Sequence, residues 1–138
     1  MEPPPGVAQG KNVPVEDFDH CNLRAHRPLL EKLRDFYVEI VGLREGPRPP
    51  FRSSGYWLYA GPRPVVHLTE AGPDESRPVD GVGTFAHVAF RCTDHERYRM
   101  LLDERNIPFV TGDVPVSGEL QYFLKDPAGN GVELSFKR

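Results

Sequence analysis

The 138-residue sequence predicts an α+β fold made of two copies of one module. The segments His20 to Arg24 and His87 to Arg91 share the pattern H-x-x-φ-R, in which φ is an apolar residue. Each is followed by a segment with the apolar spacing of a helix. Short apolar runs bounded by turn residues then follow in both halves, as expected of strands. Each module is therefore predicted to contain a strand, a helix and three further strands.

The chain is expected to divide into an arm and one domain. Residues 1–14 are rich in proline and glycine, which favours a flexible N-terminal arm. Residues 15–138 are expected to form a single domain with two modules, over 15–70 and 84–138. The residues between them are typical of a linker, since they include Gly72, Pro73, Pro78, Gly81 and Gly83.

Helix signals are clear in both modules. The first helix is expected over residues 29–41, with Pro28 suited to its first turn and Gly42 to the left-handed position that ends it. The second helix is expected to begin with a T-x-x-E capping box formed by Thr93 and Glu96. Asn106 is suited to end it.

Strands are expected over 55–60, 64–69, 84–92, 108–110, 121–124 and 131–136. Residues 126–131 predict a tight turn before the last of them. Because successive side chains of a strand point to opposite faces, His20 shares a face with Arg24 and His87 shares a face with Arg91. The pattern also places the two cysteines, Cys21 and Cys92, on the opposite faces.

Charge and composition exclude several classes of partner. The net charge is −3 and the lysines and arginines are scattered, so no nucleic-acid surface is predicted. No apolar run is long enough to span a membrane. Two cysteines and the absence of a secretory pattern at the N-terminus predict a reducing, cytoplasmic location.

Four residues of metal-ligand type occupy equivalent positions of the two modules. His67 follows His20 by 47 residues, and Glu133 follows His87 by 46. This donor set suits Zn, Ni, Fe or Mn, and the lack of cysteine disfavours a structural zinc site. A single strand histidine is more often a core or surface residue, but the duplication predicts one divalent-metal site with all four as ligands. Glu133, the only carboxylate among them, is the predicted catalytic acid or base.

Four further residues are predicted to contact a substrate. Arg24 and Arg91 share the ligand-bearing faces, where a guanidinium can bind an anionic group. The alternative for either arginine is a salt bridge at the rim of the site, or a partner across an interface. Trp57, Tyr59, Tyr122 and Phe123 could line a pocket, with Trp57 and Tyr122 as the predicted substrate contacts, although strand aromatics are more often part of a core.

These residues resemble the vicinal oxygen chelate superfamily, also called the glyoxalase/bleomycin resistance protein/dioxygenase group. The motif D-P-x-G-N-x-x-E-L, which runs here from Asp126 to Leu134, is specific to that group. The similarity covers about residues 15–138. It implies two βαβββ modules that form a curved mixed sheet around a metal-binding cup, with His20, His67, His87 and Glu133 in the ligand positions.

The resemblance also implies partners and an activity. Short members often complete the cup between two chains, so a homodimer is expected in which His20 and His67 come from one chain and His87 and Glu133 from the other. Arg24 matches an arginine that binds glutathione in glyoxalase I-type enzymes. Those enzymes usually have a glutamate at the position of His67, which disfavours glyoxalase I activity itself.

The favoured function is a metal-dependent lyase or isomerase of the glyoxalase family. In it the metal acts as a Lewis acid on a small oxygen-chelating substrate. One alternative is an iron-dependent extradiol-type dioxygenase. The other is a metal-independent protein of the bleomycin-resistance type that sequesters a drug or metabolite.

Overall fold

A computed structural model describes residues 5–6, 14–79 and 83–137. The first module contains β1 (Cys21–Ala25), α1 (Leu29–Phe36), the π-helical turn η1 (Tyr37–Val41), β2 (Arg44–Gly46), β3 (Gly55–Ala60) and β4 (Arg63–Glu70). The second contains β5 (His87–Cys92), α2 (His95–Glu104), β6 (Val110–Asp113), β7 (Leu120–Lys125) and β8 (Gly131–Phe136). The predicted α+β class and duplicated module are confirmed, while most of the predicted arm lies outside the described residues.

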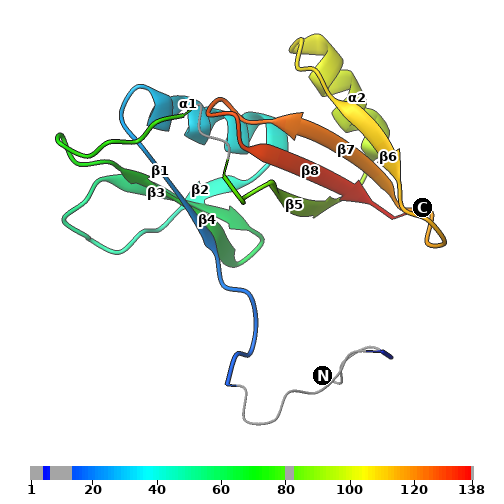
Figure 1. The fold of residues 1–138 in the computed structure, drawn as a ribbon, viewed down its shortest axis with the longest axis horizontal. Coiled ribbons are helices and arrows are strands. Elements are labelled where there is room, and N and C mark those ends of the chain that lie inside the picture. The colour runs from blue at the N-terminus through cyan, green and yellow to red at the C-terminus, as the bar shows by residue number, and fades with distance from the viewer. Residues whose placement is uncertain (1–4, 7–13, 80–82, 138) are drawn as a thin grey trace.

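Each module forms its own four-stranded mixed sheet. The first sheet has the strand order β1-β4-β3-β2 and the second sheet has the order β5-β8-β7-β6. In each sheet the first strand pairs in parallel with the last strand of its module, and the other pairs are antiparallel. β1 and β5 are therefore edge strands, and neither pairs on its outer side with a strand of the described chain (Figure 1).

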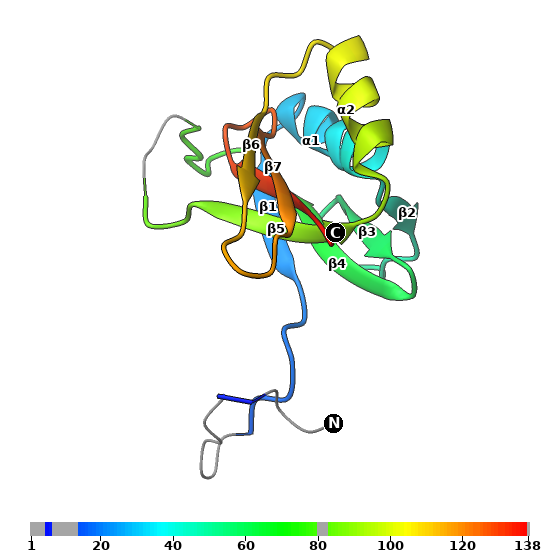
Figure 2. The same ribbon diagram turned by 90° about the vertical axis from the view of Figure 1, so that its right-hand side faces the viewer.

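The helices and the inner faces of both sheets share one apolar core. α1 contributes Leu30, Leu33 and Phe36, which are almost completely buried. Figure 2 shows α1 and α2 next to each other on one side of the molecule. The hydroxyl of Tyr98 on α2 donates to the carbonyl of Val41 in η1 at 2.6 Å. The two modules are thus held together through their helix-covered sides, which leaves the other face of each sheet open.

One buried hydrogen bond links the first module to the signature turn of the second. The hydroxyl of Tyr37 donates to Oδ2 of Asp126 at 2.8 Å. Asp126 is 4% exposed, and its carboxylate also accepts hydrogen bonds from the backbone of Ala128 and Asn130. The D-P-A-G-N turn is therefore organised around one carboxylate that the other module also binds.

Tyr37→Phe is expected to lower the free energy of unfolding by about 1.5–3 kcal/mol. It removes a hydrogen bond to a buried carboxylate and leaves the ring in place. Tyr59→Phe is the matched control, because the Tyr59 hydroxyl donates to the carbonyl of Pro47 in an exposed loop. Urea denaturation of both variants measures the difference, and equal losses would contradict the special role of Tyr37.

Three local features differ from the sequence prediction. The position of β2, one of the three strands expected after the first helix, was not predicted, because Arg44-Glu45-Gly46 carries no apolar alternation. The predicted first helix changes to π-helical geometry at Tyr37 before Gly42 ends it with a φ of 100°. The second helix is capped by Asp94, whose side chain accepts from the backbone N–H of Arg97, and the predicted cap by Thr93 is wrong.

Candidate metal centre

The open face of the first sheet brings two of the predicted ligands together. His20 directly precedes β1, and His67 lies on β4, the strand beside it. Their rings are stacked with centroids 3.7 Å apart and planes 13° apart. Trp57 on β3 stacks on the other side of His67 at 4.1 Å, so one predicted substrate residue lies directly beside the pair. Val66 and Leu68 alternate with His67 and face the core.

We call His20 and His67 the first half-site. Nδ1 of His20 lies 2.5 Å from Oδ2 of Asp19, and Nε2 of His67 lies 3.0 Å from the carbonyl oxygen of Pro64. Within the described residues, Nε2 of His20 and Nδ1 of His67 have no such partner and can bind a ligand. Burial and the nearby His20 lower the pKa of His67, which favours the neutral, metal-binding form of its imidazole.

The open face of the second sheet brings the other two predicted ligands together. Nε2 of His87 on β5 lies 3.1 Å from Oε1 of Glu133 on β8. The amide of Gln121 on β7 donates to Oε2 of Glu133 at 3.3 Å, and Phe123 meets the His87 ring edge-on at 6.1 Å. Glu133 is only 9% exposed. We call His87 and Glu133 the second half-site.

The two half-sites do not meet within one chain. No three histidine, cysteine, aspartate or glutamate side chains of the described residues converge closely enough to hold a metal ion. β1, which follows His20, and β5, which carries His87, are both edge strands in the described chain. The fold therefore presents two separate pairs of donors, each on an open face and each beside an unpaired edge.

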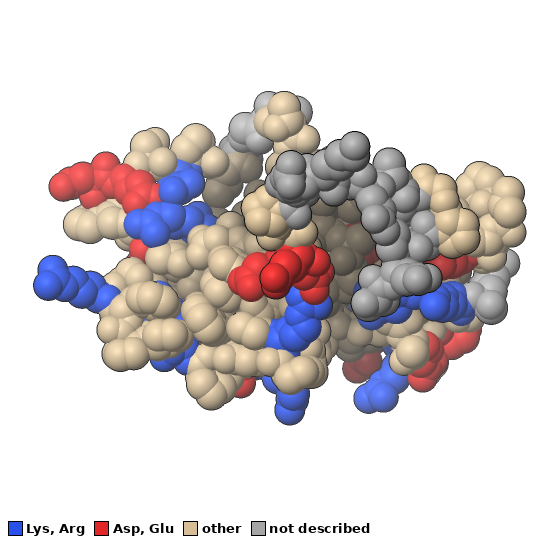
Figure 3. Space-filling model, turned by 90° about the horizontal axis from the view of Figure 1, so that it is seen from below, with Lys and Arg blue, Asp and Glu red and all other residues tan. Residues whose placement is uncertain are grey.

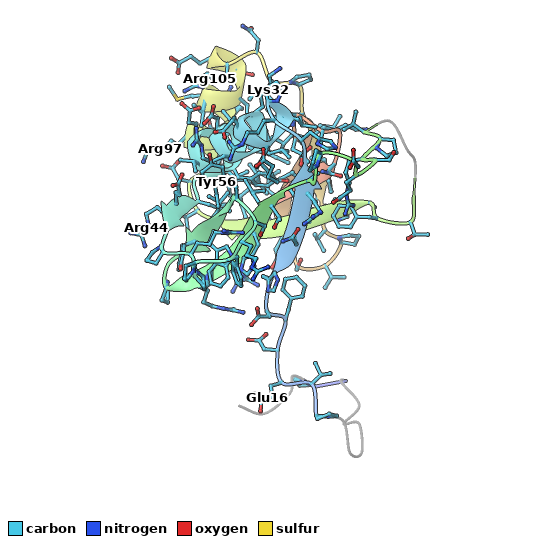
Figure 4. The ribbon with its side chains drawn as sticks, turned by 90° about the vertical axis from the view of Figure 1, so that its left-hand side faces the viewer. Glu16, Lys32, Arg44, Tyr56, Arg97 and Arg105 are labelled. Atoms are coloured by element: carbon cyan, nitrogen blue, oxygen red, sulfur yellow. The ribbon has the colours of Figure 1, made fainter. Side chains whose placement is uncertain are left out.

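Two hollows border the second module. A cleft of about 870 Å³ separates β5 and α2 from the end of the first sheet, and Arg91 is among the residues that line it. Arg44 and Arg97, which line the same cleft, lie on one side of the molecule in Figure 4. A smaller apolar hollow of about 520 Å³ lies beside His87 and is lined by Ile107, Phe109, Val110 and Phe123. On the face seen from below in Figure 3, acidic and basic side chains are interspersed.

The other predicted substrate residues have different surroundings. Nε of Arg24 donates to Glu75 at 2.6 Å, and hydrogen bonds from Arg24 and then Arg77 lower the pKa of Glu75 to about 2. Arg24 thus ties β1 to the linker, as in the salt-bridge alternative. Arg91 is exposed and has no carboxylate within 4 Å among the described residues. Tyr122 is 2% exposed and lies in the core, on the face of β7 opposite to Phe123.

Several features of the centre were not identified from the sequence. Asp19 and Gln121 each contact one candidate ligand, His20 and Glu133 respectively, and no spacing pattern in the sequence reveals these contacts. Cys21 and Cys92 lie on the inner faces, as predicted, and burial raises the pKa of both thiols. This disfavours either cysteine as a nucleophile.

Among the described residues, no helix is long and apolar enough to cross a lipid bilayer.

Comparison with solved structures supports the fold over nearly the whole chain. A Bacillus anthracis protein assigned to the glyoxalase family has a TM-score of 0.69 at 21% identity, with 94% of this chain and 100% of that chain covered. A glyoxalase/dioxygenase from Nostoc punctiforme has a TM-score of 0.69 at 19% identity and covers 96% and 99%. A lactoylglutathione lyase from Agrobacterium tumefaciens has a TM-score of 0.63 at 21% identity and covers 90% and 96%.

No curated protein sequence matches significantly. The structural similarities, all at low sequence identity, establish the fold and leave the activity open. The model of the Glyoxalase/Bleomycin resistance protein/Dioxygenase superfamily matches residues 17–134, which include both half-sites. The chain belongs to this superfamily.

Proposed function

We propose that the protein is a divalent-metal-dependent enzyme whose centre is assembled from two chains. His20 and His67 come from one chain, and His87 and Glu133 of the partner subunit complete the set. The observation that carries this proposal is the separation of two well-formed donor pairs beside the free edges of β1 and β5. An isologous dimer covers those edges. It also brings the first half-site of each chain to the second half-site of its partner, which gives two complete centres.

The residues present fit a divalent transition metal. Three imidazoles and one carboxylate match Zn, Ni, Fe or Mn, and each half-site has the outer partners that hold metal ligands in place. In the first half-site Asp19 holds the His20 ring, and in the second Gln121 holds Glu133. When bound, such a metal supplies Lewis-acid polarisation of a substrate oxygen.

We infer lyase or isomerase chemistry on a small substrate that offers neighbouring oxygens. Glu133 holds or moves the proton in this chemistry, because it is the carboxylate of the donor set and is nearly buried. The apolar hollow beside His87 has room for an apolar substituent of the substrate. His67 cannot serve as an anionic base, which separates this reaction from that of glyoxalase I.

Two other functions of the superfamily make different demands. An extradiol-type dioxygenase requires iron bound by two histidines and a carboxylate, so one of the three histidines would be spared. A sequestering protein requires a pocket and no metal. The metal-dependent enzyme is favoured because there are four donor residues and two of them are held by neighbours. Asp19 contacts His20, and Gln121 donates to Glu133.

Metal content and assembly test the proposal together. Protein loaded with Zn, Ni, Fe or Mn and then dialysed is expected to retain about one ion per chain, because a two-fold dimer has two equivalent sites. Sedimentation is expected to show a dimer, and deletion of residues 1–12 is expected to leave it intact. A metal-loaded monomer at micromolar concentration would contradict the shared centre. A dimer that retains none of the four metals would favour the sequestering function.

A further inference from the structure

The loop between β2 and β3 lies against the open face of the first sheet. At its start the Tyr59 hydroxyl donates to the carbonyl of Pro47 at 2.5 Å. In its middle Phe51 packs near Trp57, with ring centroids 6.2 Å apart. At its end Ser54 accepts a hydrogen bond from Arg27 through its hydroxyl. The loop is therefore anchored at three points, and its residues extend the wall that begins with the stacked histidines.

Arg48 is held within this loop in a defined orientation. Its Nη1 donates to the carbonyl of Ser53 at 2.9 Å and its Nη2 to the Ser53 hydroxyl at 3.1 Å. Its guanidinium lies over the Phe51 ring, 5.0 Å from the centroid. A continuous series of planar groups thus runs from Arg48 through Phe51, Trp57 and His67 to His20.

The Arg48 side chain has a hydrogen-bond donor that the protein does not use. Its Nε is buried and has no hydrogen-bond partner among the described residues. Most arginines in the described part of the chain lie within 4 Å of a carboxylate, but Arg48 does not. The others without such a partner, Arg44, Arg52, Arg91 and Arg97, are exposed. Arg48 itself is half-buried, and a buried N–H such as its Nε without an acceptor is unfavourable and indicates a missing partner.

We propose that Arg48 is a substrate-binding residue that selects a carboxylate carried on an aromatic or other planar group. The carboxylate accepts from the free donors of the Arg48 guanidinium, and the planar group packs against Phe51 and Trp57. The chelating oxygens of the same molecule then lie toward His67 and His20. This inference rests on the proposed function and deepens it, because it names the class of substrate for the same centre. It also assigns to Arg48 the anion recognition predicted for Arg24, which is bound to Glu75.

The sequence provides an intrinsic probe for this site, since Trp57 is its single tryptophan. Benzoate titrated at constant ionic strength is expected to change the Trp57 fluorescence with saturation. Arg48→Gln is expected to raise the Kd for benzoate about ten-fold or more, the loss typical of a hydrogen bond between charged groups. Benzamide has the same ring without the charge, and its Kd is expected to be unchanged by the substitution. Arg48→Lys keeps the charge and is expected to recover part of the benzoate affinity.

Arg52→Gln is the matched control, because Arg52 lies in the same loop and is exposed. It is expected to bind benzoate like the unaltered protein. Absence of saturable benzoate binding to the unaltered protein, or equal weakening by both glutamine substitutions, would overturn the proposal. Dissociation of the dimer by Arg48→Gln would also overturn it, since Arg48 would then serve the subunit interface. Metal content measured on the same samples reports separately on the proposed metal centre.

Discussion

Glu133→Gln is expected to lower turnover by about a hundred-fold or more while keeping part of the metal affinity. Glutamine retains a carbonyl oxygen that can bind the metal, but it cannot accept a proton as a carboxylate does. The amide is nearly isosteric with the carboxylate, and its carbonyl oxygen can still accept the hydrogen bond from Gln121. kcat is to be measured on the substrate found by screening hydroxy-carbonyl compounds and thiol adducts with metal-loaded protein.

Glu104→Gln is the control for this substitution, because Glu104 is an exposed carboxylate at the end of α2. It is expected to leave both turnover and metal content unchanged. A Glu133→Gln protein with normal metal content and full turnover would exclude Glu133 as the acid or base. The chemistry would then depend on the metal and its bound substrate alone.

His87→Ala is expected to weaken metal binding by more than the 10- to 100-fold that loss of an outer partner of a ligand causes. It removes a donor from the second half-site and leaves Glu133 without its closest neighbour. The side chain of His87 is 43% exposed, so little stability should be lost with it. Isothermal titration with the metal that the unaltered protein retains measures the effect.

His26→Ala is the control for His87→Ala. His26 donates from Nε2 to the carbonyl of Glu75 at 2.6 Å and belongs to neither half-site. Metal affinity is expected to be unchanged in this variant. Equal metal affinity in the His87→Ala and unaltered proteins would remove His87 from the centre.

The architecture could be predicted because it is encoded by local and repeated patterns. Apolar periodicity, turn residues and duplication of the H-x-x-φ-R segment are readable without tertiary information. The details that were predicted wrongly, the cap of α2 and the geometry at the end of the first helix, depend on contacts that local patterns do not show. Asp94 adopts a left-handed conformation with a φ of 63° and takes the capping position from Thr93. The π-helical turn at Tyr37 aligns its hydroxyl with Asp126, 89 residues away.

The candidate site could be predicted in part. Alternation along the strands brought His20 to the face of His67, and His87 to the face of Glu133, because the face of a strand follows from its sequence. Which residues lie beside these pairs depends on the register between strands and on loop paths. Arg24 is bound by a linker glutamate, and Arg48 reaches the open face through a proline-rich loop. Neither contact has a signature in the sequence.

Tyr122 shows how one residue of register changes an assignment. Phe123 is opposite Glu133 in the β7–β8 pairing, and Tyr122 is opposite the fully buried Leu134. The aromatic residue beside the second half-site is therefore Phe123, which packs against His87. In a run of two aromatic residues, only the pairing with β8 determines which one faces the site.

Subunit mixing tests directly whether the two half-sites of one centre come from different chains. His67→Ala and His87→Ala homodimers should each bind metal weakly, because every centre lacks one donor. After the two proteins are unfolded together and refolded, mixed dimers should contain one centre with all four donors intact. Since about half of the dimers are mixed and each has one such centre, about one quarter of the metal capacity should return. Recovery of none of the capacity, with dimers re-formed, would contradict the shared centre.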